Sequence, residues 1–200
     1  MREIKSVCVY CGSGAGSDPI FAEAAHALGR ELARHDLRLV YGGGDVGLMG
    51  TVARAVLEHG GYVTGIIPDF LKAREAMIDE AQETIVVPDM HTRKQMMFER
   101  ADAFIALPGG IGTLEELVEQ MTWAQLGRHT KPILMLSIAD FWKPLLVLLA
   151  HMRESGFIRP GLELSYLVAE RVEEIVPMLG KAAARSRPDT LAERLIEERF

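Results

Sequence analysis

The sequence predicts an α/β fold built on a parallel β-sheet with helices on both faces, and two observations support this. Short apolar runs of four to seven residues alternate along the chain with longer segments of helical periodicity. Uninterrupted alternation of this kind produces right-handed βαβ crossovers and therefore a parallel sheet. Glycine-rich segments follow three of the apolar runs, as they do in doubly wound sheets. We therefore expect a doubly wound, Rossmann-like sheet of about seven strands.

The predicted strands are runs rich in aliphatic and β-branched residues, each bounded by turn residues. The unbroken apolar run at residues 103–107 is typical of a strand that is covered on both faces. In chain order, strands are expected at residues 4–10, 37–41, 62–67, 84–87, 103–107, 132–137 and 164–168.

The predicted helices follow the strands and begin at recognisable caps. Ser17 or Asp18 can cap the first helix, Pro19 suits its first position, and Asp89 can cap the helix that precedes the fifth strand. The polar segment at residues 69–83 predicts a short helix and a loop. Longer helices are expected at residues 22–35, 51–59, 90–100, 113–126, 139–155 and 169–184.

Composition and charge are those of an ordinary globular domain, which we place at residues 1–184. Of the 200 residues, 48% are hydrophobic and 25% are charged, and the formal net charge is −6. A negative net charge argues against nucleic acid as the main partner. The start of the chain does not resemble a signal peptide, and no apolar run approaches the ~20 residues that span a bilayer. We expect a cytoplasmic protein that does not bind membranes.

The tail at residues 185–200 carries a weak apolar stripe formed by Leu191, Leu195 and Ile196. This pattern suits a helix that docks on a partner subunit, and it equally suits a loosely held end. The sequence leaves both alternatives open.

The two cysteines, Cys8 and Cys11, have the C-x-x-C spacing of a thioredoxin-like redox pair or of half a zinc site. Zinc would need two more ligands, and the six histidines show no paired ligand spacing. Cys8 also lies inside an apolar run, which favours a buried strand residue over a redox cysteine. We expect neither a metal nor an organic cofactor.

The segment at residues 108–112, here called the Pro-Gly-Gly loop, joins the fifth strand to a helix with an apolar stripe at Leu114, Leu117, Val118 and Met121. Glycines let the backbone approach a ligand, and the free N–H groups of a helix's first turn attract anions. A phosphate-bearing ligand is therefore one hypothesis.

Thr113 and Glu116 offer a purely structural alternative for the same segment. They match a capping box, in which the threonine caps the helix and the glutamate hydrogen-bonds to the backbone of the cap. Taken alone, this spacing is more often a cap than a catalytic device.

Glycine-rich loops at residues 12–16, 42–50 and 109–112 all follow strands and should converge at one edge of the sheet, where they can line a nucleotide-sized crevice. The loop at residues 42–47 matches G-x-G-x-x-G, with Asp69 near the spacing of a ribose-binding acid. This match suggests an NAD-dependent oxidoreductase, but the dinucleotide fingerprint belongs in the first βα turn and this copy lies in the second. The Walker phosphate-binding motif is missing from the sequence.

Several ordered motifs resemble those of the LOG (Lonely Guy) family, from about residue 7 to residue 158. They lie at residues 9–13, 41–44, 47–50, 90–94, 108–116 and 122–127. The family consists of cytokinin riboside 5′-monophosphate phosphoribohydrolases, which release the free base and ribose 5-phosphate. The resemblance implies a homodimer whose sites use residues of both chains, and it does not reveal whether the natural base is adenine or an N6-prenylated adenine.

The resemblance also implies site residues, with Arg93 and Glu116 as the catalytic pair. A carboxylate can stabilise the oxocarbenium-like state of a ribose and orient or deprotonate the attacking water. We expect Glu116 to suit this role because it lies opposite the apolar stripe of its helix, while the guanidinium of Arg93 can hold phosphate or ribose. Substrate contacts are expected from Gly12, Ser13, Gly43, Gly44, Glu75, Lys94, Gly109, Gly110, Ile111, Gly112, Thr113, Leu114, Glu115 and Thr122.

Other interpretations of these residues stay open at the level of sequence. Without the family, Arg93 and Lys94 would be amphipathic helix residues, Glu75 a solvated surface charge and Glu115 a partner of the helix dipole. A non-catalytic carrier similar to molybdenum-cofactor carrier proteins is the alternative function. Relatives were labelled lysine decarboxylases, but pyridoxal-phosphate chemistry needs a Schiff-base lysine in a cofactor site, and Lys94 is the only lysine in a family motif.

Overall fold

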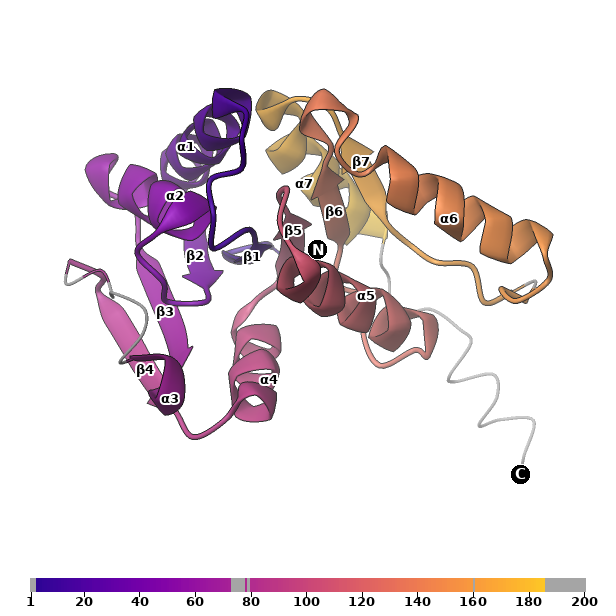
Figure 1. Ribbon diagram of the computed structural model, residues 1–200, viewed down its shortest axis with the longest axis horizontal. Coiled ribbons are helices and arrows are strands. Elements are labelled where there is room, and N and C mark those ends of the chain that lie inside the picture. The colour runs from indigo at the N-terminus through magenta and orange to yellow at the C-terminus, as the bar shows by residue number, and fades with distance from the viewer. Residues whose placement is uncertain (1–2, 73–77, 79, 160, 186–200) are drawn as a thin grey trace.

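A single seven-stranded parallel sheet organises the computed structural model of the protein (Figure 1), which describes residues 3–72, 78, 80–159 and 161–185. The strand order is β4-β3-β2-β1-β5-β6-β7, and every neighbouring pair is parallel. This confirms the predicted doubly wound fold. The strands are β1 (Ser6–Tyr10), β2 (Arg38–Tyr41), β3 (Val63–Pro68), β4 (Glu83–Val87), β5 (Ala103–Ala106), β6 (Ile133–Leu136) and β7 (Leu167–Ala169).

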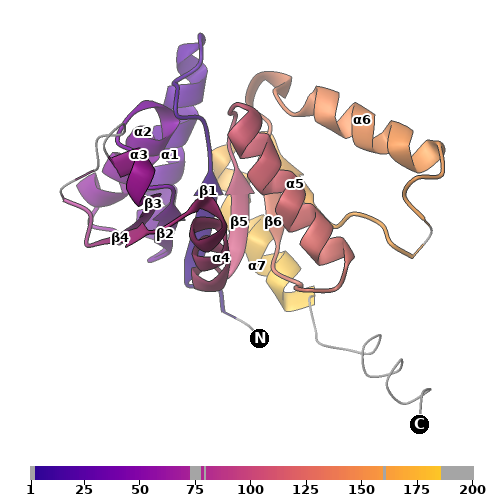
Figure 2. The ribbon, with the colours of Figure 1, turned by 60° about the horizontal axis from the view of Figure 1, so that its bottom comes forward.

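Helices connect the strands and cover both faces of the sheet (Figures 1 and 2). Asp18 caps the first helix through the N–H of Ile20, and Asp89 caps the fourth through the N–H of Thr92 at 2.7 Å. The helices are α1 (Pro19–Arg34), α2 (Gly47–Glu58), α3 (Asp69–Lys72), α4 (Met90–Arg100), α5 (Ile111–Gln125), α6 (Lys143–Glu154) and α7 (Ile175–Arg185), with 3-10 turns η1 (Ile138–Asp140) and η2 (Val172–Glu174).

Two separate cores explain why the strand sequences are apolar without interruption. Side chains alternate along a strand, so Val7 and Val9 of β1 pack with α1, α2 and α7 on one face of the sheet. Cys8 and Tyr10 face the other side, where they pack with α4, α5 and α6. Cys8 is therefore a buried strand residue, as predicted. Both cysteines are free, and burial raises the pKa of each thiol, which is the opposite of a reactive redox cysteine.

The boundaries of several elements differ from the sequence prediction. The second helix begins at Gly47 rather than at residue 51. The helix expected at residues 139–155 is divided into η1 and α6, because Ala139 and Asp140 adopt positive φ angles of 49° and 60°. The last strand is β7, Leu167–Ala169, and the following segment starts as η2 before α7. Propensity does not reveal such breaks, since tertiary packing decides them.

The direction in which strands are added to the sheet reverses between β1 and β5. The chain runs outward from β1 to β4 and then returns to lie beside β1 as β5, where Val7 pairs with Ala103. Ligands of doubly wound sheets bind beyond the carboxyl ends of the strands at such a reversal. Within the part of the chain that the structure describes, no helix is both long and apolar enough to cross a membrane.

Helices α1 and α2 pack so closely that Gly29 has no room for a side chain. A Cβ built at Gly29 would lie 2.5 Å from the carbonyl oxygen of Val52 and 2.6 Å from the Cβ of Ala55. Contacts this short force backbone or side chains to move.

We predict that Gly29→Ala destabilises the protein, although alanine in a helix is normally about 1 kcal/mol more favourable than glycine. The steric overlap should outweigh the gain in propensity and lower the melting temperature in thermal unfolding followed by circular dichroism. Arg30→Ala, at the exposed neighbouring position, is the control and should leave the melting temperature nearly unchanged. A Gly29→Ala variant that melts at or above the wild-type temperature would contradict this account.

Candidate active site

The three glycine-rich loops meet at the carboxyl edge of the sheet, as the sequence predicts. The N–H of Gly12 donates to the carbonyl of Pro108 at 3.1 Å, and the N–H of Leu48 donates to the carbonyl of Gly12 at 3.1 Å. The loop after β1 is thus hydrogen-bonded to the Pro-Gly-Gly loop on one side and to the start of α2 on the other. Its glycine permits the contact, because a Cβ at Gly12 would lie 2.9 Å from the carbonyl oxygen of Gly14.

A cavity of about 280 Å³ lies beside this junction. It is lined by the first and third glycine-rich loops and by Phe21 and Phe141, whose ring centroids are 5.8 Å apart. Four predicted substrate-contact residues line it, namely Gly12, Ser13, Gly109 and Gly110.

Helix α5 begins earlier than predicted, and this changes the interpretation of Thr113. Gly110 is the N-cap and Ile111 the first helical residue, so the buried Thr113 is the third residue of the helix and not its cap. Its side chain instead packs against Gly109, where any Cβ would overlap the Thr113 hydroxyl. The capping box is therefore wrong. The N–H groups of the first turn lack intrahelical partners, and Ile111 is exposed, so the turn is open to an anion.

Arg93 of α4 is buried with its guanidinium at the carboxyl ends of β2 and β3. Its Nε donates to the carbonyl of Ile66 at 3.2 Å, and its Nη2 donates to the carbonyl of Gly42 at 3.1 Å. A Cβ at Gly42 would overlap Nη2, so only glycine leaves room for the guanidinium. Backbone carbonyls thus hold the arginine without neutralising its positive charge. Hydrogen bonds and burial therefore fix the position of the guanidinium. This differs from the alternative in which Arg93 is an ordinary residue of an amphipathic helix.

Glu116 lies in the second turn of α5, half-buried and within the electrostatic reach of Arg93. Burial raises the pKa of its carboxyl to about 7, while the positive charge of Arg93 acts in the opposite direction. The expectation that Glu116 lies opposite the buried face is wrong. That face is formed by Thr113, Leu117, Gln120 and Met121, and Glu116 borders it, whereas Val118 of the predicted stripe is exposed.

Lys94 ties α4 to α5 next to these two residues. Its Nζ lies 2.5 Å from Oε1 of Glu115 and 3.0 Å from Oε1 of Glu119. Desolvation lowers the pKa of Lys94, but the two carboxylate partners outweigh it and raise the pKa above its ordinary value. Lys94 is next to Arg93 in the sequence, and Glu115 is next to Glu116. The ion pairs therefore hold α4 and α5 together at the residues that adjoin the predicted catalytic pair.

The remaining predicted site residues do not all lie near the glycine-rich loops. Gly43 and Gly44 are buried in the loop after β2, and Gly43 has a positive φ of 83°. Leu114 packs against the core on the α5 side of the sheet. Thr122 lies six residues beyond Glu116, about 9 Å along the helix axis, and its hydroxyl donates to the carbonyl of Val118. The structure therefore does not bring Thr122 to the loops, and Glu75 lies outside the described residues.

Gln120 is a polar residue that sequence reasoning missed. It is fully buried one turn after Glu116, and neither its Nε2 nor its Oε1 has a hydrogen-bond partner among the described residues. Buried amides are almost always paired, so this one is an unusual feature of the site's surroundings. In the sequence, only the four-residue spacing between Glu116 and Gln120 could have indicated that Gln120 lies near the site. The described residues also contain no group of three or more histidine, cysteine or acidic side chains arranged for a metal.

Comparison with known proteins connects this geometry to a family. A family model described as "possible lysine decarboxylase" matches residues 49–179. The cytokinin riboside 5′-monophosphate phosphoribohydrolase LOG7 of Arabidopsis thaliana is 47% identical over 183 residues, which cover 90% of this chain and 84% of the relative. The cytokinin riboside 5′-monophosphate phosphoribohydrolase of Rhodococcoides fascians is 46% identical over 170 residues, 84% of this chain and 86% of the relative.

Solved structures share the fold at lower identity. The molybdenum cofactor carrier protein of Chlamydomonas reinhardtii has a TM-score of 0.66 at 19% identity, covering 92% of this chain and 99% of that protein. The molybdenum cofactor binding protein of Rippkaea orientalis has a TM-score of 0.66 at 21% identity, covering 90% and 98%. These likenesses confirm the fold alone. From its identity with the curated relatives and its match to the family model, the chain belongs to the LOG family.

Proposed function

We propose that the protein hydrolyses the N-glycosidic bond of cytokinin riboside 5′-monophosphates or AMP, giving the free base and ribose 5-phosphate. The observation that carries this proposal is the convergence of Arg93, Glu116 and the glycine-rich loops at the carboxyl edge of the sheet. The names of the 44–47% identical relatives support the same substrate class.

The 5′-phosphate binds at the first turn of α5 in this proposal. The N–H groups of Ile111, Gly112 and Thr113 and the positive end of the helix dipole favour a dianion there. The loop after β1 lies against the Pro-Gly-Gly loop and adds the backbone of Gly12 and the side chain of Ser13. Gly109 and Gly110 allow the phosphate to approach the backbone closely.

Arg93 and Glu116 act on the ribose. As the bond between C1′ and the base breaks, positive charge develops on the sugar, and an ionised Glu116 stabilises that charge. Glu116 also orients water or takes its proton as the new C1′–O bond forms. The departing base takes a proton from solvent, so one water molecule is consumed for each bond cleaved. The guanidinium of Arg93 holds the ribose and keeps the carboxylate aligned.

Lysine decarboxylation fits the site poorly. A Schiff-base lysine must be available as a neutral amine, which enzymes achieve by lowering its pKa. Lys94 has the opposite environment, because Glu115 and Glu119 hold it in the ammonium form. A carrier without catalytic activity is the second alternative, and it would not need a carboxyl whose pKa is brought near neutrality.

The deciding experiment incubates purified protein with AMP and with isopentenyladenosine 5′-monophosphate and measures the free base by chromatography. We expect release from at least one of the two, and a decrease of about 100-fold or more for Glu116→Gln and Arg93→Ala. Gly42→Ala should cause a similar loss by displacing the guanidinium, without removing a catalytic side chain.

Glu23→Gln and Arg30→Ala, at exposed positions of α1, are matched charge-removing controls and should retain full activity. Adenosine, which lacks the phosphate, should be turned over far more slowly than AMP. Tight binding of nucleotide without release of base would favour the carrier. If Glu116→Gln kept near wild-type activity, the carboxylate would not be needed for the reaction and its proposed role would be wrong.

The pH dependence of kcat/KM follows from the pKa of Glu116. Because this pKa is raised to about 7, the carboxyl of the folded protein is protonated at pH 6 and ionised at pH 8. An ionised carboxylate is the active form, so kcat/KM should fall about tenfold per pH unit below 7 and level off above it. Initial rates across pH 5–9 test this, provided the protein stays folded. A decline on the alkaline side instead would show that the protonated acid is required.

We also propose that the protein works as a homodimer. The apolar side chains of Ile111, Leu126 and Phe157 are 82%, 74% and 85% exposed, so a partner subunit has apolar surface to cover. Helix α6 projects from the body of the protein and buries only Leu149 (Figures 1 and 2).

A dilution series checks the dimer, with molecular mass followed by analytical ultracentrifugation and base release measured at each concentration. Activity per chain should fall as the protein dissociates, because the partner is expected to complete each site. In the Phe157→Asp variant, activity per chain should begin to decrease at a higher protein concentration than in the wild type. Glu23→Gln should not change that concentration. Constant activity per chain in a monomeric sample would rule out a shared site.

A further inference from the structure

Within the described part of the chain, the buried side-chain atoms that lack a hydrogen-bond partner belong to two adjacent residues of α5. They are Oε2 of Glu119 and both amide atoms, Oε1 and Nε2, of Gln120. Buried polar side chains elsewhere are paired. The hydroxyl of Thr64 donates to Glu83 at 3.0 Å, and both ring nitrogens of His129 have partners. Leaving a buried amide unpaired is costly, so the amide of Gln120 is expected to bind something.

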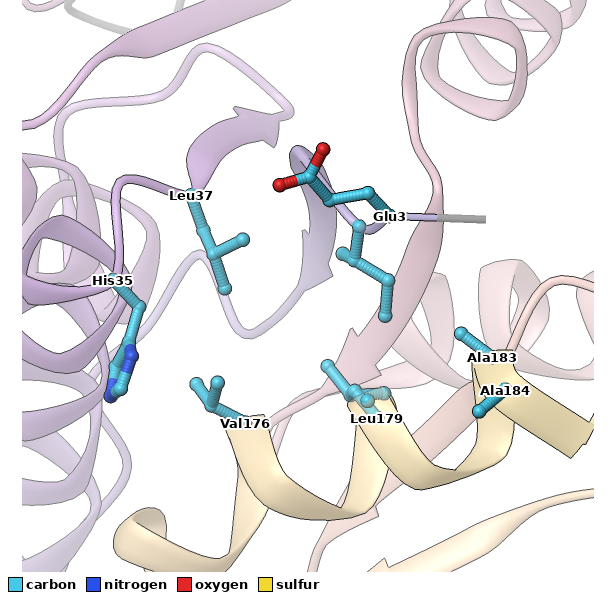
Figure 3. A pocket seen from close by; sticks show the side chains of 9 residues that line it. Glu3, His35, Leu37, Val176, Leu179, Ala183 and Ala184 are labelled. Atoms are coloured by element: carbon cyan, nitrogen blue, oxygen red, sulfur yellow. The ribbon is translucent and has the colours of Figure 1, made fainter. Parts of the chain in front are cut away.

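The cavity at the opposite edge of the sheet shows no such feature (Figure 3). It measures about 610 Å³, and Val176 and Leu179 of α7 line one wall. Its ionisable side chains, Glu3 and His35, are both exposed, and none of the unpaired buried atoms of the described residues belongs to its lining. The tail at residues 186–200, which follows α7, lies outside the described residues. The unpaired atoms are therefore confined to the helix that carries Glu116.

Glu119 and Gln120 belong to the stripe of α5 that faces α4. At the i, i+3, i+4 and i+7 spacing of one helix face, this stripe consists of Glu116, Glu119, Gln120 and Trp123. Oε1 of Glu119 lies 3.0 Å from Nζ of Lys94. The ring centroid of Trp123 lies 5.2 Å from that of Phe98. Both contacts are with α4, so Gln120 lies between two points at which the helices touch.

Glu116, Glu119 and Gln120 form a triangle on this stripe. Side chains three and four residues apart are neighbours on a helix, with Cβ atoms about 5–6 Å apart. The buried Tyr10 supports this arrangement, because burial raises its pKa most and the charges of both glutamates raise it further. One water molecule in the triangle can accept from Nε2 of Gln120 and donate to both carboxyl groups. Buried waters typically make about three hydrogen bonds to otherwise unpaired groups.

We propose that Gln120 is a positioning residue for Glu116 and acts through one buried water molecule that its amide holds between α4 and α5. The water donates to the ionised carboxylate of Glu116, limits its rotation and stabilises its charge. Gln120 is fully buried, so it acts without touching the substrate. The consequence for base release rests on the proposed function, whereas the consequence for the ionisation of Glu116 does not.

Other groups also act on the carboxyl of Glu116. Burial raises its pKa to about 7, and the charge of Arg93 opposes this. The titratable and charged groups within its electrostatic reach are Cys8, Tyr10 and Cys11 of β1 and the residue after it, Arg93 and Lys94 of α4, and Glu115 and Glu119 of α5. A neutral substitution at residue 120 leaves all of them in place. A change in the titration of Glu116 then reports the loss of the hydrogen bond.

Two substitutions separate positioning from packing. Gln120→Met preserves the length and approximate volume of the side chain but cannot hold the water, and its melting temperature should equal or exceed that of the wild type. Gln120→Asn keeps the amide but removes a methylene from the core, so its melting temperature should decrease. A packing role predicts that Gln120→Met is the more active variant. A positioning role predicts that Gln120→Asn is the more active, in spite of its lower stability.

We expect Gln120→Met to lower kcat about tenfold with little change in KM and to raise the pH midpoint of kcat/KM by about one unit. Gln120→Asn should lie closer to the wild type in both. Met121→Leu, a volume-conserving change at the buried neighbouring position, is the matched control and should change neither. Wild-type kcat and pH midpoint in Gln120→Met would overturn the proposal, as would lower activity of Gln120→Asn than of Gln120→Met.

Titration of Glu116 in the ligand-free protein tests the proposal without turnover. The carboxyl-carbon resonance, assigned with Glu116→Gln, is followed by NMR over the pH range used for the rates. Gln120→Met should raise the midpoint by about one pH unit, whereas Met121→Leu should not. A shifted midpoint in a protein that releases no base would support the positioning role and contradict the proposed function. An unshifted midpoint in a protein that does release base would overturn the positioning role alone.

Discussion

The position of the Arg93 guanidinium is the constraint on which the rest of the site depends. A buried charge is costly unless polar groups replace its water, and the carbonyls of Ile66 and Gly42 do so here. Because carbonyls carry no net charge, the site keeps a positive charge for an anionic ligand. This fixes several other features. Residue 42 must be glycine, and α4 must place Arg93 at the ends of β2 and β3.

Glu116 and Lys94 complete the electrostatic arrangement between α4 and α5. Lys94 is held by Glu115 and Glu119, so it neutralises part of the acidic cluster instead of facing a ligand as a free cation. Glu116 remains the carboxyl whose pKa burial raises to about 7. One helix thus supplies both the anion-attracting first turn and, one turn later, an acid that titrates near neutrality. That proximity is appropriate for a molecule with a phosphate on one side of a ribose and a base on the other.

Sequence periodicity predicted the fold almost completely, because a doubly wound sheet repeats the same local pattern seven times. The convergence of the glycine-rich loops also followed, since parallel strands all end at one edge. The start of α5 was missed because Thr113 and Glu116 satisfy the spacing of a cap, and only packing of Thr113 against Gly109 shows where the helix begins. The carbonyl partners of Arg93 lie 27 and 51 residues away, and Gln120 is buried by tertiary contacts, so no local pattern contains either.

Fold likeness alone would leave the function open, because molybdenum cofactor carrier proteins have the same architecture at about 20% identity. What separates a carrier from a hydrolase is whether the site can stabilise a transition state. A carrier requires only ground-state contacts, which loop backbone and a helix N-terminus supply. A carboxyl half-buried beside a buried arginine adds nothing to ground-state binding of a phosphate and would repel it when ionised. Its presence one turn from the proposed phosphate position is therefore better explained by charge that develops on the sugar during bond cleavage.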